Sequence, residues 1–207
     1  MRQIANGTHI KTDKNPLAHG VLGSYCLPYQ SDIKINHMKF VGANKMKDYL
    51  GGCSCGKIRY ELIDEPMFTH CCHCHLCQQI TGSAFITNTL IEGTNFKLTS
   101  GKLASFIGAS GSGRRHTIKR CPDCGDPIVS YFGGTEHLAV FKAGTLDNPN
   151  LVPPEAHVFV ETKVDWLQIP DDTPSFKAFY DFEETWPADA FLRLQKIRKL
   201  QQKKPRS

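Results

Sequence analysis

The residues most suited to chemistry in this chain are its nine cysteines, which are spaced unevenly. Six of them fall within the 25 residues from position 53 to position 77. The full set is Cys26, Cys53, Cys55, Cys71, Cys72, Cys74, Cys77, Cys121 and Cys124. No apolar signal segment is visible in the first residues, and in such a chain a clustered, odd number of cysteines favours metal binding over disulfides. Cys26 stands alone and is expected to be an ordinary free thiol.

Three cysteine groups have the short spacing that lets neighbouring sulfurs bind one ion. They are Cys53-Ser-Cys55, Cys72-His-Cys74-His-Leu-Cys77 and Cys121-Pro-Asp-Cys124. Zinc takes four ligands in tetrahedral geometry, and a tight turn between two cysteines points both sulfurs at one ion. A glycine follows both Cys55 and Cys124, where it lets the backbone turn closely around a metal. These patterns predict zinc sites.

Seven cysteines do not fill two four-ligand sites, so the most economical division is four plus three. A closed, structural site would then be formed by Cys53, Cys55, Cys121 and Cys124. An open site, whose fourth position takes water or substrate as in catalytic zinc centres, would be formed by Cys72, Cys74 and Cys77. The spacing leaves another arrangement open, in which both sites are structural because a fourth ligand comes from Cys71, His73 or His75.

Short strand-like segments, separated by turn residues, must position these cysteines. The expected strands are Lys57–Ile63, Ala84–Ile91, Phe96–Thr99, Leu103–Ile107, Arg115–Lys119, Pro127–Phe132, His137–Ala143 and His157–Val160. Many short strands without βαβ alternation favour an all-β sandwich or an open barrel. The segment Gly108–Gly113 lacks the ending of a phosphate-binding loop and is expected to be a hairpin loop. Trp166 is expected in the core.

The 207 residues divide into three parts. Residues 1–48 are polar and are expected to be a weakly ordered N-terminal extension, followed by a zinc-binding domain at 49–182. Residues 183–207 predict an amphipathic C-terminal helix and a basic tail, with Pro187 suited to the first helical turn. No apolar run approaches the ~20 residues of a membrane helix, so a soluble, cytoplasmic protein is expected.

The formal net charge of +5 comes from the end of the chain. The last fifteen residues hold seven basic side chains and no acidic one, which leaves 18 basic against 20 acidic residues elsewhere, a formal −2. This balance disfavours a nucleic-acid-binding domain. A local basic cluster is expected to be a solvated strand edge, with binding of a carboxylated thiol as the alternative, and consists of Arg114, Arg115, Lys119 and Arg120.

Five ordered motifs resemble those of the glutathione-dependent formaldehyde-activating (GFA) enzymes of the CENP-V/GFA group, over about residues 50 to 182. They are GGCSCGKIRY at 51–60, CHCHLC at 72–77 with TGSAF at 81–85, CPDCG at 121–125, GTLD at 144–147, and PEAHVF at 154–159 with Asp165-Trp166. The resemblance implies a mainly β, zinc-binding β-tent fold with two Zn²⁺ per chain. It also implies the four-plus-three division given above, with the three-cysteine zinc as the catalytic one.

The activity that the resemblance implies is a carbon–sulfur lyase reaction, which forms or cleaves thiol–aldehyde adducts. The expected partners are a small, glutathione-like thiol and an aldehyde, without nucleic acid or membrane, and a homodimer stays open. Gln78 stands where the family commonly has an arginine, and Arg120 where it commonly has an aromatic residue. The missing cation at position 78 would weaken binding of an anionic thiol.

No side chain stands out as an acid or base. His157 is the best candidate because it lies in the PxxH signature, where it either positions a zinc ligand or moves a proton. His73 and His75 flank the zinc cysteines and are expected to be exposed loop residues. The rival from another class is a non-catalytic two-zinc scaffold, which a fourth protein ligand at the three-cysteine site would favour.

Overall fold

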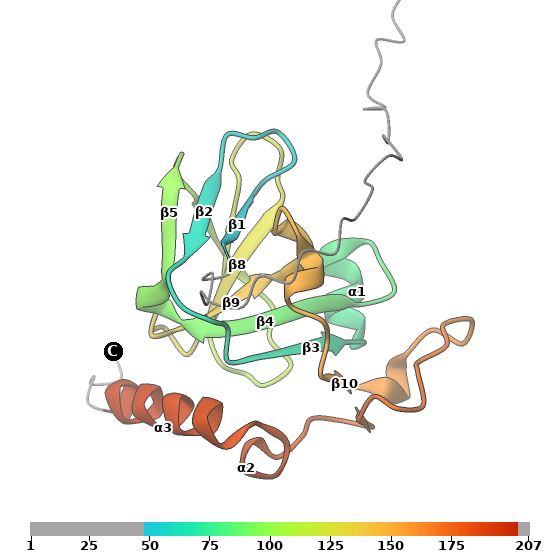
Figure 1. Cartoon of the computed structure of the whole chain (residues 1–207). Helices are drawn as coiled ribbons and strands as arrows, with labels where there is room; N and C mark the ends of the chain where they lie inside the picture. Colours follow the sequence, from blue (N-terminus) through green and yellow to red (C-terminus); the bar gives the residue numbers. More distant parts are fainter. Residues whose placement is uncertain (1–47, 203–207) are drawn as a thin grey trace, which may run out of the picture. The chain divides into compact units, whose positions relative to one another are not determined.

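A computed structural model describes residues 48–202 of the chain (Figure 1). The predicted N-terminal extension lies outside the described residues except for position 48, and so do residues 203–207 of the basic tail. The described segment contains two β-sheets, and a long helix near the C-terminus follows them. The prediction of a mainly β fold with a C-terminal helix is confirmed, whereas the open barrel that the strand pattern allowed does not form among these residues.

The smaller sheet has three antiparallel strands in the order β1-β2-β5. These are β1 (Tyr49–Gly52), β2 (Arg59–Leu62) and β5 (Phe96–Ser100).

The larger sheet has eight strands in the order β11-β10-β3-β4-β9-β8-β7-β6. Their bounds are β3 (Phe68–Cys72), β4 (Ile86–Glu92), β6 (Ala104–Gly108), β7 (His116–Arg120), β8 (Pro127–Phe132), β9 (Leu138–Lys142), β10 (Ala156–Val158) and β11 (Ser175–Phe176). Only the pairs that involve β10 are parallel, with β3 and with β11. β6 and β7 pair in antiparallel fashion, so the expected hairpin between them is present.

The two faces of the larger sheet bury different side chains, because neighbouring residues of a strand point to opposite faces. On one face Phe141 of β9 packs against Tyr60 of the smaller sheet, with ring centroids 6.2 Å apart. On the other face Val140 belongs to a cluster with Phe68 and Trp186. The larger sheet therefore separates two apolar cores.

Three α-helices accompany the sheets: α1 (His75–Thr81), α2 (Phe182–Thr185) and α3 (Ala188–Gln202). Helix α3 buries Ala190, Leu194 and Ile197, which lie on one side of the helix at spacings of three and four residues. These side chains join the cluster around Phe68, so α3 covers part of the sheet face that also carries Cys72. Among the described residues, no helix is long and apolar enough to cross a membrane.

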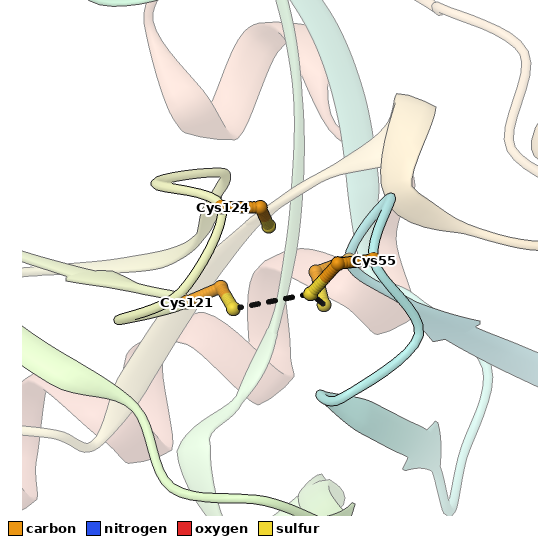
Figure 2. Close-up of side chains that lie close together, drawn as sticks. Cys55, Cys121 and Cys124 are labelled. Carbon is orange, nitrogen blue, oxygen red and sulfur yellow. Dashed lines mark hydrogen bonds between the residues drawn. The ribbon is translucent and has the colours of Figure 1, made fainter. Parts of the chain in front are cut away.

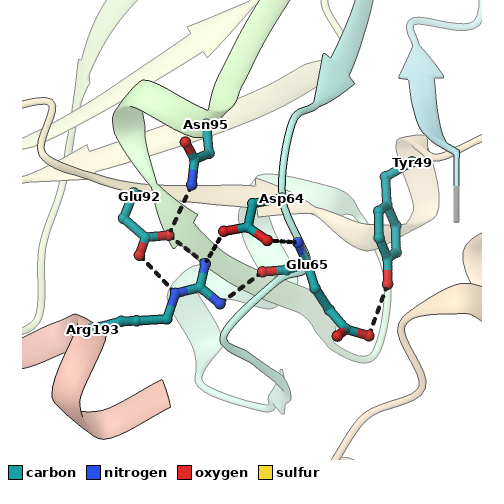
Figure 3. Close-up of polar contacts among 6 residues, drawn as sticks. All are labelled: Tyr49, Asp64, Glu65, Glu92, Asn95 and Arg193. Carbon is teal, nitrogen blue, oxygen red and sulfur yellow. Dashed lines mark hydrogen bonds and ion pairs between the residues drawn. The ribbon is translucent and has the colours of Figure 1, made fainter. Parts of the chain in front are cut away.

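Arg193 connects α3 to the sheets through hydrogen bonds and ion pairs of its half-buried guanidinium group (Figure 3). Its Nε donates to Glu92 Oε1 at 2.7 Å, its Nη2 to Glu92 Oε2 at 2.5 Å, and its Nη1 to the carbonyl oxygen of Glu65 at 2.9 Å. Asp64 lies 3.7 Å from the same guanidinium. One side chain thus connects the helix to β4 and to the segment between β2 and β3.

Trp166 is not a core residue, contrary to expectation, because it is 74% exposed. It follows the short turn Val160–Thr162, in a stretch where Lys163 Nζ donates to the carbonyl oxygens of Val164 and Leu167. The tryptophan that does lie in the apolar core is Trp186, which stacks on Phe68.

Candidate metal centres

The first cysteine group brings together two hairpin turns, one between β1 and β2 and one between β7 and β8. The sulfurs of Cys53, Cys55, Cys121 and Cys124 all lie within 4.8 Å of one another. Cys55 Sγ is 3.3 Å from Cys53 Sγ and 3.7 Å from Cys121 Sγ (Figure 2). Four sulfurs placed tetrahedrally at ~2.3 Å from a zinc ion are ~3.8 Å apart, so the donor set and its spacing fit zinc.

Backbone and side-chain contacts hold these two turns in register. Ile58 N–H donates to Cys53 Sγ at 3.2 Å, and Ser54 N–H donates to Asp126 Oδ2 at 2.7 Å. Lys57 and Asp123 form an ion pair of 2.6 Å across the same gap. Because β1 and β2 belong to the smaller sheet and β7 and β8 to the larger, this group connects the two sheets.

The electrostatics of the first group differ between its cysteines, because the neighbouring sulfurs raise the pKa of Cys55 to about 12 but lower that of Cys53. Burial raises the pKa of Cys53, but hydrogen bonds from Ile58 N–H and from the neighbouring thiols outweigh it and bring the pKa down to about 7. The Ser54 amide lowers the pKa of Asp126, which therefore stays an acceptor. Cys53 is thus disposed to lose its proton, whereas Cys55 would lose its proton on binding a metal.

The second group lies where β3 ends and α1 begins. Cys72 is the last residue of β3, Cys74 caps the N-terminus of α1, and Cys77 lies in its first turns. Their three sulfurs lie within 4.8 Å of one another, with Cys72 Sγ and Cys74 Sγ at 3.5 Å. No sequence pattern predicted α1, although this short helix turns Cys77 back toward Cys74.

Hydrogen bonds concentrate negative charge on Cys74. Bonds from Cys72 and Cys77, with a further one from the Cys77 N–H at 3.4 Å, lower the pKa of Cys74 to about 2. The bond to Cys74 raises the pKa of Cys72 to about 12. Three soft sulfur donors suit zinc, and the set is one short of the four ligands that zinc usually takes.

None of the three candidates for a fourth ligand joins this sulfur group within the described part of the chain. Cys71 Sγ lies 3.5 Å from Thr87 Oγ1 instead. His75 is exposed, as expected, but His73 is fully buried, and the expectation of an exposed loop residue is wrong. His73 Nε2 and His157 Nδ1 are hydrogen-bonded at 2.8 Å, so the histidine predicted at position 157 contacts the residue between Cys72 and Cys74.

The backbone of His73 is held from several sides. Its N–H donates to the Val158 carbonyl at 3.0 Å, and its carbonyl accepts from Gln78 Nε2 at 2.7 Å and from Thr162 Oγ1 at 3.1 Å. Gln78 Nε2 also donates to the Thr162 carbonyl at 2.9 Å. The glutamine that departs from the family pattern thus fixes the loop carrying Cys72 and Cys74. Sequence reasoning missed this role, because it depends on the turn Val160–Thr162 lying beside α1.

Two members of the basic cluster have partners close by. Lys119 forms an ion pair of 2.6 Å with Glu136 and lies 5.3 Å from the Tyr131 ring centroid. Arg120 Nη1 donates to the Gly125 carbonyl at 3.0 Å and so supports the turn that carries Cys121 and Cys124. The expectation of a strand edge is wrong for these two residues, because β7 pairs with β6 on one side and β8 on the other.

A buried lysine on β9 was not expected from the sequence. Lys142 is 9% exposed, and its Nζ donates to Asn88 Oδ1 at 2.9 Å. Burial lowers its pKa to about 8, while the electrostatic influence of Cys77 and Cys72 acts in the opposite direction. The one sequence signal is a lysine that ends the otherwise apolar strand Leu138–Lys142.

Comparison with known proteins gives one family. The family model described as glutathione-dependent formaldehyde-activating enzyme, GFA, matches residues 48–162, which is more than half of the chain. No curated protein matches it. Among solved structures, a structural-genomics crystal structure of a Rhodobacter sphaeroides protein is similar at 17% identity and a TM-score of 0.38, covering 49% of this chain and 92% of that one.

Proposed function

This chain belongs to the glutathione-dependent formaldehyde-activating family, and on that premise we propose that it is a zinc-dependent carbon–sulfur lyase. Its reaction would form or cleave the adduct between a small, glutathione-like thiol and an aldehyde. The four-cysteine group would hold a structural zinc and the three-cysteine group a catalytic one. The observation that carries the proposal is the second sulfur group, which contains three cysteines and no fourth ligand from residues 48–202.

Zinc held by Cys72, Cys74 and Cys77 would lower the pKa of a thiol that binds beside them, so that the thiol reacts as thiolate. The sulfur then adds to the carbonyl carbon, a C–S bond forms, and the π electron pair of the C=O bond moves to the oxygen, which takes a proton. The reverse sequence cleaves the C–S bond. The three cysteines act as ligands and not as nucleophiles.

The surrounding side chains would keep the three sulfurs in place. His157 bonds His73, and Gln78 fixes the His73 carbonyl, so both restrain the loop between Cys72 and Cys74. We therefore assign His157 to positioning this loop. Its pKa is lowered by burial, which favours the neutral ring that such a hydrogen bond needs.

The proposal is tested on zinc-loaded protein with glutathione and formaldehyde, by exchange spectroscopy in an NMR spectrometer, since the uncatalysed addition is already fast. The full chain should accelerate exchange between thiol and adduct, and Cys74→Ser should abolish the acceleration and lose one zinc while the fold is kept. Cys71→Ser is the matched control, because Cys71 neighbours the group without belonging to it. Full acceleration and two zinc ions in Cys74→Ser would refute the proposal and favour a two-zinc scaffold.

A further inference from the structure

Lys142 lies on the same sheet face as the three-cysteine group. His70, Asn88 and Lys142 stand directly opposite one another on β3, β4 and β9, which are neighbouring strands (Figure 1). Directly opposed residues share a face, and so do residues two apart on one strand. Cys72 is two residues from His70 and therefore belongs to the same face. The Lys142 side chain crosses from β9 to Asn88 on β4, which brings its ammonium group toward the strand that carries Cys72.

The charge of Lys142 has no carboxylate partner among the described residues. Asn88 is neutral and is the single hydrogen-bond partner of Nζ in this part of the chain, which leaves two of the three ammonium donors unused. Lysines are rarely buried unless an opposite charge compensates them.

The other titratable groups on this face do not offer Lys142 a negative charge, because the Glu92 carboxylate is paired with Arg193 and the histidines are neutral. His70 is buried, its Nδ1 lies 2.9 Å from the Tyr180 hydroxyl, and burial lowers its pKa to about 3. Burial also lowers the pKa of His116, so both rings are neutral at neutral pH. The negative charge that could compensate Lys142 on this face is therefore that of the three-cysteine group, once its sulfurs bind a metal as thiolates.

The same face has polar atoms that the protein's own contacts leave unsatisfied. Ser130 stands opposite Val140 and is 1% exposed, and its Oγ has no hydrogen-bond partner within residues 48–202. His116 Nε2 is also buried and unpartnered there. Buried polar groups are normally hydrogen-bonded, so this face has capacity for polar atoms from outside the chain.

We propose that Lys142 is a positioning residue that supplies the counter-charge for the substrate thiolate at the three-cysteine centre. The inference rests on the proposed function. Zinc with three cysteine thiolates has a net charge of −1, and a bound substrate thiolate makes it −2. In a partly buried site this second negative charge is costly unless a cation compensates it, and Lys142 is placed to do so. Lys142 therefore favours anionic ligands at the open position over neutral ones.

The test compares two ligands on cobalt-substituted protein at pH 7, whose visible spectrum reports changes in coordination. 2-Mercaptoethanol binds as a thiolate and adds one negative charge, whereas imidazole binds neutral and adds none. Lys142→Met, which keeps the length of the side chain, should weaken thiol binding about 10- to 30-fold and leave imidazole binding unchanged. Lys142→Gln provides a second neutral variant in case the first does not fold. Lys97→Met is the control, because it removes an exposed charge on the smaller sheet.

Each outcome decides a different point. A selective loss of thiol affinity in a neutral Lys142 variant supports the counter-charge. Equal loss for both ligands indicates a merely structural role and overturns the inference, as does unchanged affinity for both. If the unmodified protein binds neither ligand at cobalt, the open position itself is absent, and the proposed function fails first.

Discussion

Arg193 provides a quantitative test of how α3 is attached to the sheets. Both partners of the Arg193–Glu92 pair have side chains that are 22% exposed, and two parallel hydrogen bonds of 2.7 and 2.5 Å join them (Figure 3). Exposed ion pairs contribute ~0.2–1 kcal/mol, whereas removal of one partner from a buried pair costs ~3–5 kcal/mol. Because this pair is half-buried, we expect the cost of breaking it to lie between these two values. Replacing the arginine also removes the hydrogen bond to the Glu65 carbonyl.

We expect Arg193→Met to lower the free energy of unfolding by about 2–3 kcal/mol in zinc-saturated protein. Urea denaturation of the single variants Arg193→Met and Glu92→Gln and of the double variant gives the coupling energy, expected at about 1–2 kcal/mol. Lys196→Met is the matched control, because it removes a charge from an exposed position of the same helix. A coupling energy below ~0.3 kcal/mol would refute the reasoning, since it would mean that the pair contributes no more than a solvated one.

The Arg193–Glu92 pair also predicts how the free energy of unfolding depends on pH. Burial raises the pKa of Glu92, but the hydrogen bonds and charge of Arg193 outweigh it and leave the pKa below its usual value. A carboxyl with a lowered folded-state pKa contributes stability that is present above its unfolded pKa of ~4.3 and is lost as the pH falls through the folded value. The stability difference between the unmodified protein and Arg193→Met should therefore shrink below pH ~4. A difference that stayed constant down to pH ~3 would contradict this linkage.

Three further changes test other parts of the account. Cys124→Ser should reduce zinc from two ions to one per chain and lower the melting temperature by more than ~10 °C, because the first group joins the two sheets; calorimetry showing an unchanged transition would contradict this. Gln78→Ala should lower the free energy of unfolding by about 1–2 kcal/mol and speed metal loss to a chelator, because the His73 carbonyl loses a hydrogen-bond donor. Metal release as slow as that of the unmodified protein would contradict this. Leu194→Ala should destabilise the protein by about 2–4 kcal/mol in urea denaturation, because this side chain is 2% exposed; a cost under ~1 kcal/mol would show that α3 packs loosely.

The strands were predictable wherever local sequence decides them. Pro127–Phe132 has the expected bounds, and Phe96–Thr99 differs by one residue, because β-branched and aromatic residues there are separated by clear turn signals. Strand β3 was missed because all five of its residues are buried and it shows no alternation. Helix α1 was missed because a seven-residue helix carries too short a pattern, although Gly82 ends it in the left-handed conformation that a glycine favours.

Cysteine spacing predicted both sulfur groups, because the chemistry of zinc requires short loops between ligands. What surrounds those groups depends on contacts between residues far apart in the chain. His73 and His157 are hydrogen-bonded although 84 positions separate them in the sequence, and Lys142 and Asn88 although 54 positions do. Neither contact has a local signature, so the buried histidine and the buried lysine become visible only when the strands are paired.

The most direct test of the central claim is a crystal structure of zinc-loaded protein soaked with 2-mercaptoethanol, with anomalous differences measured across the zinc edge. The account predicts two zinc peaks. One should lie among the sulfurs of Cys53, Cys55, Cys121 and Cys124, and the other should be bound by three cysteines and the sulfur of the added thiol. A second peak whose fourth ligand is a side chain of this chain, unchanged by the thiol, would contradict the open catalytic position.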